Sequence, residues 1–303
     1  MAAVTVLGEL GEIGSMAYGC WRFAGTDVAA ARTKIETALE VGMKLIDTAD
    51  VYGYDGSAPA PAAGFGDAEE LLGRLLADAP GLRDRMVLAT KGGITPPVPY
   101  DSSRTYLREA CEASLRRLRT DVIDLYQIHR PDLLAHPAEV AGALDELVAS
   151  GKVRAIGVSN FAAGQTRALQ AHLDSRLATT QPEFSPLALD PILDGSFDLA
   201  METGLVPLTW SPLAGGRLAG DVDPVDARAA AVAQVCDRLA AEHDVSRTAI
   251  LLAWAMNHPA GVVPIIGTQQ PDRIRDSARA TDVEMTPSQW YEILVAGRGE
   301  PMP

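Results

Sequence analysis

The sequence contains few cysteines and no long apolar run. Its 303 residues include only three cysteines, Cys20, Cys111 and Cys236, which lie far apart and show neither metal-binding nor redox spacing. We interpret them as reduced thiols of a cytoplasmic protein. No run reaches the roughly 18 apolar residues that a membrane span needs. The first 14 residues lack a basic segment and contain Glu9 and Glu12, so no signal peptide is expected.

Positive charge is also scarce. The chain has 26 lysines and arginines against 40 acidic residues, which gives a formal net charge of −14 and a pI near 4.8. Such a charge repels phosphate backbones and anionic lipids, and therefore disfavours nucleic acid or a membrane surface as a partner. A basic cluster, Arg116, Arg117 and Arg119, falls on a predicted helix, and we interpret it as a solvated helix face.

Two further patterns exclude simple motif assignments. The five histidines show no HxH or HExxH spacing, which disfavours a metal hydrolase, and we expect no metal site. The glycines of "GELGEIG" (residues 8–14) repeat every three positions but lack the GxGxxG pattern, and only a short apolar run precedes them. They predict a turn ahead of the main fold rather than a nucleotide-binding loop.

Strand-like and helix-like segments alternate along the chain. Eight short apolar runs read as strands, at 16–20, 44–47, 85–91, 122–129, 152–160, 177–184, 205–213 and 261–267. Amphipathic segments read as helices, around 35–42, 67–77, 107–118, 137–150, 163–173, 227–241, 246–257, 271–280 and 287–296. This alternation predicts an α/β fold, a (β/α)8 TIM barrel over residues 1–303 as a single domain. It has an extra helix after strand seven and a C-terminal helix. A doubly wound open sheet is the alternative.

Polar residues follow the apolar core of nearly every predicted strand. In a (β/α)8 barrel the carboxyl ends of the strands form the active-site face, so these side chains are expected to share one mouth. Each of them alone has a structural interpretation as a cap, a turn residue or a satisfied core histidine. The strand-end residues are Asp47, Lys91, His129, Ser159, Asn160, Gln181, Trp210, Ser211, Gly267 and Thr268.

Four of the residues at this mouth can form a proton donor together with groups that lower its pKa and bind the substrate. A free tyrosine has a pKa near 10, and a nearby lysine is expected to lower that of Tyr52. Lys91 is the candidate lysine, with Asp47 to hold it charged, while a neutral His129 can hydrogen-bond a substrate carbonyl. Because no side chain supplies a hydride, carbonyl reduction requires a nicotinamide cofactor.

Other polar residues suit the parts of such a cofactor. Ser159, Asn160 and Gln181 can hold a carboxamide, and Trp210 can stack on a flat ring. The loop "SPLAGGRLAG" (211–220) has glycines that let backbone amides approach a pyrophosphate, with Arg217 close by for its charge.

The sequence resembles the aldo-keto reductase superfamily over nearly its whole length. The resemblance is closest to the bacterial branch with short C-termini, and "TWSPLA" is also similar to the potassium-channel β-subunits of that superfamily. The stretches that carry it are "LIDTADVYG", "VLATK", "DLYQIHRPD", "GKVRAIGVSNF", "TWSPLAGGRLAGD" and "VPIIGTQQPDRIRDS". It implies a barrel that reduces aldehydes or ketones with NADPH, and a small carbonyl compound as partner.

The resemblance also implies roles for individual residues. Asp47, Tyr52, Lys91 and His129 match the catalytic tetrad, with Tyr52 as general acid. The residues that match the nicotinamide positions are Ser159, Asn160, Gln181 and Trp210. Those that match the pyrophosphate loop are Ser211, Leu213 and Arg217, and those that match the adenosine end are Arg273, Asp276 and Ser277. The strand-end residues Gly267 and Thr268 complete the expected cofactor-binding set.

Some positions depart from the family pattern. Gly267 stands where many members have a lysine against the 2′-phosphate, and Ser277 replaces a frequent asparagine. The preference for NADP over NAD therefore depends mainly on Arg273, and NAD is the less favoured cofactor. His129 at the fourth tetrad position implies, by the same resemblance, reduction of carbonyls rather than of carbon–carbon double bonds, which in the family goes with glutamate at this position.

Five points have more than one interpretation or none from the sequence alone. A cofactor-binding regulatory subunit with little turnover is the non-enzymatic alternative. Arg130, if it faces the mouth, favours substrates with a carboxylate or phosphate, and the alternative is a salt bridge with Asp132 or a neighbouring loop. Trp21 is either an apolar wall of the pocket or part of the core. Asp50 is a loop residue with no assigned role, and no feature of the sequence indicates an oligomeric state.

Overall fold

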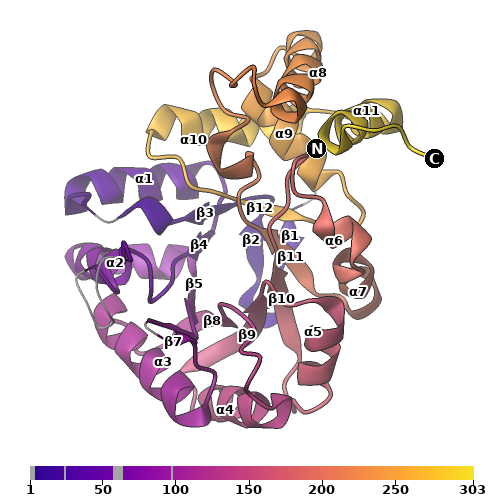
Figure 1. Ribbon diagram of the computed structural model, residues 1–303. Coiled ribbons are helices and arrows are strands. Elements are labelled where there is room, and N and C mark those ends of the chain that lie inside the picture. The colour runs from indigo at the N-terminus through magenta and orange to yellow at the C-terminus, as the bar shows by residue number, and fades with distance from the viewer. Residues whose placement is uncertain (1–3, 24, 57–63, 97) are drawn as a thin grey trace.

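Eight parallel strands form a closed barrel (Figure 1). The computed structural model describes residues 4–23, 25–56, 64–96 and 98–303. The barrel strands are β3 (Ala17–Gly19), β4 (Leu45–Asp47), β5 (Val87–Gly92), β8 (Ile123–Ile128), β9 (Val153–Ser159), β10 (Leu177–Gln181), β11 (Val206–Thr209) and β12 (Val263–Ile266). The last strand pairs with the first, Ile265 with Ala17 and Ile266 with Tyr18. The predicted (β/α)8 barrel is therefore confirmed, and the open-sheet alternative is wrong because no edge is left between β12 and β3.

Helices surround this barrel (Figure 1). They are α1 (Val28–Glu40), α2 (Asp67–Asp78), α3 (Arg104–Leu118), α4 (Pro137–Ala149), α5 (Ala163–Gln170), α6 (Asp190–Leu193), α7 (Ser196–Thr203), α8 (Ala227–His243), α9 (Arg247–Met256), α10 (Pro271–Ala278) and α11 (Pro287–Arg298). Several begin after a residue whose side chain accepts a hydrogen bond from the first turn, namely Asp27, Ser103, Asp226 and Ser246. The extra helix after the seventh barrel strand, α8, and the C-terminal helix, α11, lie where they were predicted. Helices α6 and α7 were not predicted.

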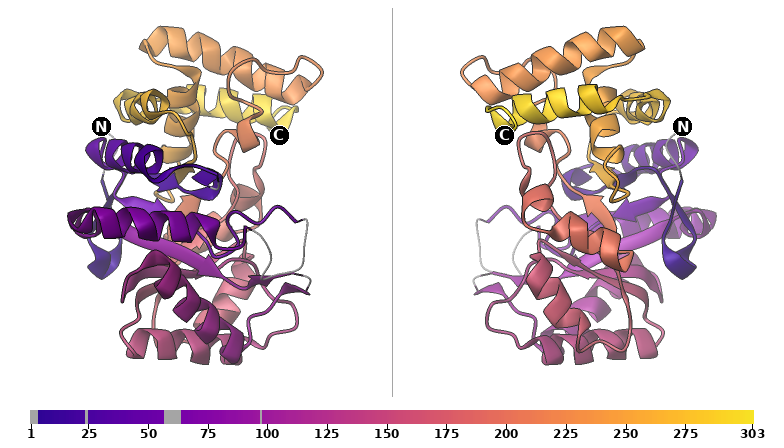
Figure 2. Two further views of the ribbon diagram at one scale, coloured as in Figure 1. Left: turned by 90° about the vertical axis from the view of Figure 1, so that its left-hand side faces the viewer. Right: turned by 90° about the vertical axis from the view of Figure 1, so that its right-hand side faces the viewer.

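A hairpin closes the end of the barrel opposite the strands' carboxyl ends. It consists of β1 (Thr5–Val6) and β2 (Glu12–Gly14), joined by a short 3₁₀ helix, Gly8–Leu10. Leu7 and Ile13 are buried among the inward side chains of the barrel, and Figure 2 shows the hairpin projecting from one end of the barrel. The repeated glycines of this stretch thus form the expected turn.

The two-residue period of the strands determines which side chains reach the mouth. Along β5, Val87 and Ala89 belong to the apolar cluster inside the barrel, whereas Leu88 belongs to the cluster under the helices. Since successive side chains alternate between the two faces, Lys91 enters the barrel above Ala89, and Thr90 faces the helices.

The prediction that the basic cluster on α3 is a solvated face is correct for two of its three arginines. Arg116 and Arg119 are exposed, as a solvated face requires. Arg117 is instead partly buried and turns toward α2, where its Nε lies 2.7 Å from a carboxylate oxygen of the fully buried Glu69. Within the described residues, no helix is both long enough and apolar enough to cross a bilayer.

Candidate active site

Lys91 is the centre of the candidate active site. Its Nζ donates hydrogen bonds to Asp47 Oδ2 at 2.7 Å, to the Thr48 carbonyl at 2.8 Å and to the Tyr52 hydroxyl at 2.9 Å. These three acceptors use all three N–H groups of an ammonium. Burial disfavours the charged form of Lys91, but Asp47 and Tyr52 outweigh it and raise the pKa of Lys91. The buried ammonium therefore keeps its charge at neutral pH.

Tyr52 differs from the prediction in the direction of its pKa shift. Lys91 lowers the pKa of Tyr52, as expected, but burial of the phenol raises it more, and Asp47 adds to the increase. The pKa of Tyr52 is therefore raised above its ordinary value, because removing a proton here would leave a phenolate poorly solvated. The phenol thus retains its proton at neutral pH, which suits a proton donor rather than a base.

His129 lies beside Tyr52 as an uncharged ring. The two ring centroids are 5.8 Å apart with the planes at 78°. Burial, together with the charges of Lys91 and Arg130, holds the pKa of His129 well below 6.5. Among the described residues, its Nδ1 is a buried atom with no hydrogen-bond partner. A neutral imidazole has one N–H to donate, and it can direct that group at an acceptor in the mouth.

The turn after β4 brings Asp47 and Tyr52 to the same side. The Thr48 amide bonds to the Ala89 carbonyl at 2.9 Å and the Asp50 amide to the Lys91 carbonyl at 3.1 Å, so this segment continues to pair with β5. The Tyr52 amide then closes a tight turn on the Ala49 carbonyl. This explains the spacing of five residues: one side chain ends the strand and the other comes from its turn.

Gln181 contacts the same carboxylate from the far wall. Its Nε2 donates to Asp47 Oδ1 at 3.1 Å, and both side chains are buried. Sequence reasoning placed Gln181 at the mouth but missed this contact. The sequence indicates that both residues end strands, but it has no signal that their side chains meet. Each carboxylate oxygen of Asp47 thus has its own donor, one from Lys91 and one from Gln181.

The remaining polar residues of the mouth form a connected network. Asn160 Nδ2 donates to Ser159 Oγ at 2.8 Å and to the His129 carbonyl at 3.2 Å. Trp210 Nε1 donates to Asn160 Oδ1 at 3.0 Å, and Ser159 Oγ donates to the Gln181 carbonyl at 2.9 Å. Asn160 has a left-handed backbone, φ 59°, which turns its amide group toward these partners.

The loop after β11 has an unusual backbone. Positive φ angles occur at Ser211, Ala214, Gly215 and Gly216, between 50° and 104°. The amides of Ala214, Gly216 and Arg217 donate to carbonyls within the loop and close its turns. The loop also contains the partly buried Leu213. Arg217, the predicted counter-charge, is exposed and pairs with Asp226 at the start of α8.

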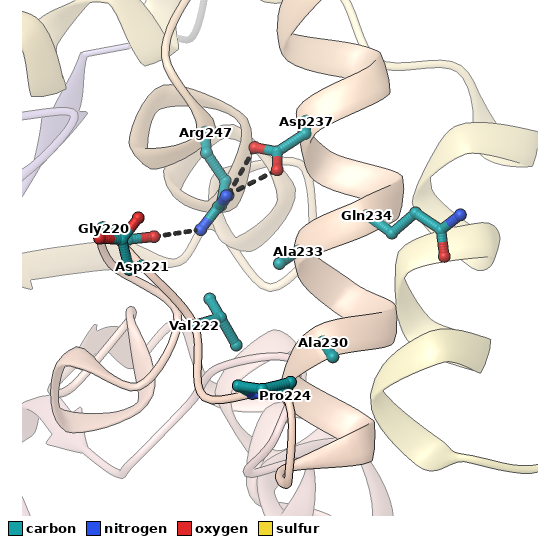
Figure 3. A pocket seen from close by; sticks show the side chains of 9 residues that line it. All are labelled: Gly220, Asp221, Val222, Pro224, Ala230, Ala233, Gln234, Asp237 and Arg247. Carbon is teal, nitrogen blue, oxygen red and sulfur yellow. Dashed lines mark hydrogen bonds and ion pairs between the residues drawn. The ribbon is translucent and has the colours of Figure 1, made fainter.

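A second residue fixes the far end of this loop. Arg247 on α9 donates to the Gly220 carbonyl at 2.7 Å and binds both carboxylate oxygens of Asp237 at 2.6 Å (Figure 3). A groove of about 460 Å³ lies beneath residues 220–224 and is bordered by α8. The groove contains none of the four tetrad candidates, so we do not regard it as the catalytic pocket.

The residues predicted for the adenosine end lie around the start of α10. The carbonyls of Gly267 and Thr268 accept hydrogen bonds from Gln269 Nε2 and the Tyr18 hydroxyl, respectively. The other members of this set are Arg273, which is exposed, Asp276, which accepts from Ser246 Oγ at 2.5 Å, and Ser277, whose hydroxyl donates to the Arg273 carbonyl.

Two further candidates lie at the mouth. Trp21 is 62% exposed, so the alternative that it packs in the core is wrong. The guanidinium carbon of Arg130 lies 5.7 Å from the Trp210 ring centroid. The alternative salt bridge between Arg130 and Asp132 does not occur, because the Asp132 carboxylate accepts hydrogen bonds from the Ser102 and Leu134 amides instead.

Comparison with known proteins identifies close relatives over almost the full length. Residues 15–295 match the profile of the Aldo/keto reductase family. A 6-dehydroglucose reductase of Novosphingobium aromaticivorans is 54% identical over 300 residues, which cover 98% of this chain and 96% of the relative. A 6-dehydroglucose reductase of Agrobacterium fabrum is 38% identical, with 95% and 96% covered.

Two solved structures have the same fold over nearly the whole chain. A glycerol dehydrogenase from Gluconobacter oxydans superposes with a TM-score of 0.83 at 27% identity, over 100% of this chain and 98% of the other. An aldo/keto reductase from Klebsiella pneumoniae, solved with NADP and acetate, gives a TM-score of 0.78 at 25% identity, over 100% and 97%.

Proposed function

The chain belongs to the aldo/keto reductase family, and from this we propose that it uses NADPH to reduce an aldehyde or ketone to an alcohol, with Tyr52 as the general acid. The observation that supports this most directly is the hydrogen bond of 2.9 Å between Lys91 Nζ and the Tyr52 hydroxyl, with Asp47 behind the lysine. A protonated phenol against a buried ammonium is an arrangement that can give up a proton and stabilise the anion left behind.

The residues of the mouth suit a nicotinamide cofactor. Ser159, Asn160 and Gln181 provide hydroxyl and amide groups of the kind that bind a carboxamide, and the Trp210 ring is only partly buried. We place a phosphate of the cofactor against the loop after β11, which has several left-handed residues and carries Arg217. When bound, the reduced cofactor supplies the hydride that forms the new C–H bond.

The proton follows a separate path from the hydride. Tyr52 donates its phenolic proton to the carbonyl oxygen of the substrate, so that the carbonyl gains one hydride at carbon and one proton at oxygen. Lys91 stabilises the resulting phenolate, and Asp47 with Gln181 holds Lys91 in place. His129, neutral at pH 7, donates its N–H to the same carbonyl oxygen and orients it toward Tyr52.

The names of two relatives suggest a substrate class for the proposed reaction. Two relatives are named as 6-dehydroglucose reductases, and we extend this activity to the present chain, with a sugar aldehyde as the carbonyl compound. Arg130 and Trp21 border the mouth and offer a charged donor and an aromatic face, both of which suit polar, ring-shaped substrates. Arg130 would in addition favour substrates that carry a carboxylate.

Steady-state oxidation of NADPH, with NADH in parallel, tests this proposal. The substrates are 6-dehydroglucose, simple aldehydes and aldehydes with a carboxylate. We expect Tyr52→Phe to lower kcat by about 10²- to 10⁴-fold while NADPH still quenches protein fluorescence on binding. Tyr291→Phe, at a half-exposed tyrosine on α11, is the matched control. Full activity of Tyr52→Phe would overturn the mechanism, and NADPH binding without turnover of any substrate would favour the regulatory alternative.

A further inference from the structure

Glu183 is an acidic residue at the mouth that the proposed mechanism does not use. It lies two residues beyond Gln181, the last residue of β10, and it pairs in parallel with Trp210, which follows β11. The Trp210 amide donates to the Pro182 carbonyl at 3.1 Å, and the Phe184 amide donates to the Trp210 carbonyl at 3.2 Å. The segment therefore stays extended up to Phe184, and its side chains keep the alternation of a strand.

This alternation directs the Glu183 side chain into the mouth. Gln181 points into the barrel, where it reaches Asp47 at the end of β4. Phe184 points the other way, toward the helices, and its ring stacks on Trp254 of α9 with the centroids 4.8 Å apart. Glu183 therefore shares the face of Gln181, and its side chain is half-buried. A glutamate that still reaches solvent is ionised at neutral pH.

Arg130 brings a positive charge to the same place. It follows His129 beyond the end of β8, and β9 and β10 separate β8 from β11 in the barrel. Its guanidinium nevertheless lies 5.7 Å from the ring centroid of Trp210, so the side chain extends across the mouth toward β11. Glu183 is the neighbour of Trp210 on β10. Within the described residues, neither Arg130 nor Glu183 makes a side-chain hydrogen bond or a direct ion pair.

The charges around Glu183 leave Arg130 as its free counter-charge. Burial raises the pKa of Glu183, and Arg130 opposes this increase. Asp190 at the start of α6 and Arg217 add smaller effects of opposite sign. Arg217 is already paired with Asp226. Arg130 and Glu183 thus lie near enough to influence each other without contact, and both can still bind a third group.

We propose that Arg130 and Glu183 together bind hydroxyl groups of the substrate, and that Glu183 is a specificity-determining residue that limits the binding of carboxylates. This inference rests on the proposed function, because it concerns the substrate of that reaction. A hydroxyl group can accept from the guanidinium and donate to the carboxylate at the same time. A substrate carboxylate can only accept, and it meets a like charge on Glu183. The pair therefore favours a neutral carbonyl compound with several hydroxyl groups.

The pair changes the specificity that Arg130 alone would give. A lone arginine at the mouth attracts carboxylates and phosphates. A neighbouring glutamate offsets that charge and supplies a strong acceptor for O–H groups. Loss of the Glu183 charge therefore affects anionic substrates in the opposite direction to loss of Arg130. A role of these residues in folding alone would not separate the substrates by charge.

Kinetics with three aldehydes tests the proposal: glyceraldehyde has hydroxyl groups, succinic semialdehyde has a carboxylate, and butanal has neither. Glu183→Gln removes the charge but keeps an acceptor, and we expect it to raise kcat/KM for succinic semialdehyde relative to butanal by about tenfold. Glu183→Ala also removes the acceptor and is expected to lower kcat/KM for glyceraldehyde relative to butanal by about tenfold. Arg130→Gln is expected to lower the ratio for succinic semialdehyde. Glu109→Gln, at an exposed glutamate on α3, is the control.

Unchanged ratios in both Glu183 variants would overturn the proposal, and so would changes of the same sign in Glu183→Gln and Arg130→Gln. Calorimetric binding of butyrate distinguishes this result from a failure of the proposed function, because butyrate is neither an aldehyde nor a ketone and requires no turnover. We expect Glu183→Gln to bind butyrate about tenfold more tightly than the wild-type protein, and Arg130→Gln to bind it more weakly. If none of the aldehydes is reduced, these affinities still support the charge pair, and equal affinities refute it.

Discussion

Replacing Lys91 by methionine is a direct test of the buried ion pair. Methionine has a similar length but lacks the charge and the three N–H donors that Lys91 directs at Asp47, Thr48 and Tyr52. The side chain of Asp47 is only 3% exposed and would lose its counter-ion. Breaking a buried pair from one side typically costs about 3–5 kcal/mol. We therefore expect Lys91→Met to lower the free energy of unfolding by an amount in this range.

The double variant Asp47→Asn/Lys91→Met separates stability from activity. It removes both charges, and a neutral pair of similar volume is often no less stable than a buried salt bridge. We expect the double variant to regain most of the stability that the single variant loses. We expect both variants to remain nearly inactive, about 10²- to 10⁴-fold below wild type in kcat, because neither stabilises a Tyr52 phenolate.

Urea unfolding monitored by tryptophan fluorescence measures the first effect, and NADPH-dependent turnover measures the second. Lys44→Met is the control, because Lys44 pairs with Glu12 at 2.9 Å on the surface, with both side chains about half exposed. A surface pair of this kind contributes about 0–1 kcal/mol. If Lys91→Met were no less stable than Lys44→Met, or if the double variant regained activity, the reasoning about the buried pair would be wrong.

Two further predictions concern pH and cofactor choice. Because the pKa of His129 lies well below 6.5, an unfolded chain takes up a proton there that the folded chain does not, and stability falls as pH drops below about 6.5. His129→Gln is therefore expected to lose less in Tm than wild type between pH 7.5 and pH 5.5, and equal losses would contradict this. Arg273→Ala is expected to raise the KM for NADPH by roughly tenfold or more, as loss of a charge-assisted contact does, and to leave the KM for NADH unchanged. A parallel increase in both values would exclude a contact with the 2′-phosphate.

The sequence predicts the barrel well because its signals are local. Each barrel strand is a short apolar run bounded by turn residues, and the strand ends lie within a few residues of the predicted positions. The helices α6 and α7 were missed because they are only 4 and 8 residues long and are separated by Asp194 and Gly195. The four residues of α6 are too few for a helical period, and the break at Asp194 and Gly195 prevents one continuous period over both helices.

The missed features of the site depend on contacts between distant segments. Gln181 and Asp47 are 134 positions apart, and no spacing in the sequence indicates that one donates to the other. Glu69 did offer a signal, because it lies three residues before Leu72 and seven before Leu76 on the buried face of α2. An acid on that face requires a partner, and Arg117 on α3 provides it. Asp50 has no assigned role in the sequence because nothing near it in the chain indicates that its side chain is buried, which the structure shows.

The closure of the barrel between β3 and β12 has a consequence for how the protein is made. The Tyr18 hydroxyl binds the Thr268 carbonyl across 250 positions of sequence, so the first barrel strand meets its last neighbour only after most of the chain has left the ribosome. At about 5–20 residues per second, this interval is roughly 10 to 50 s. During that time one edge of β3 offers unpaired backbone groups to other nascent chains. Translation speed and chaperone supply therefore influence how much of the synthesised chain reaches the closed barrel.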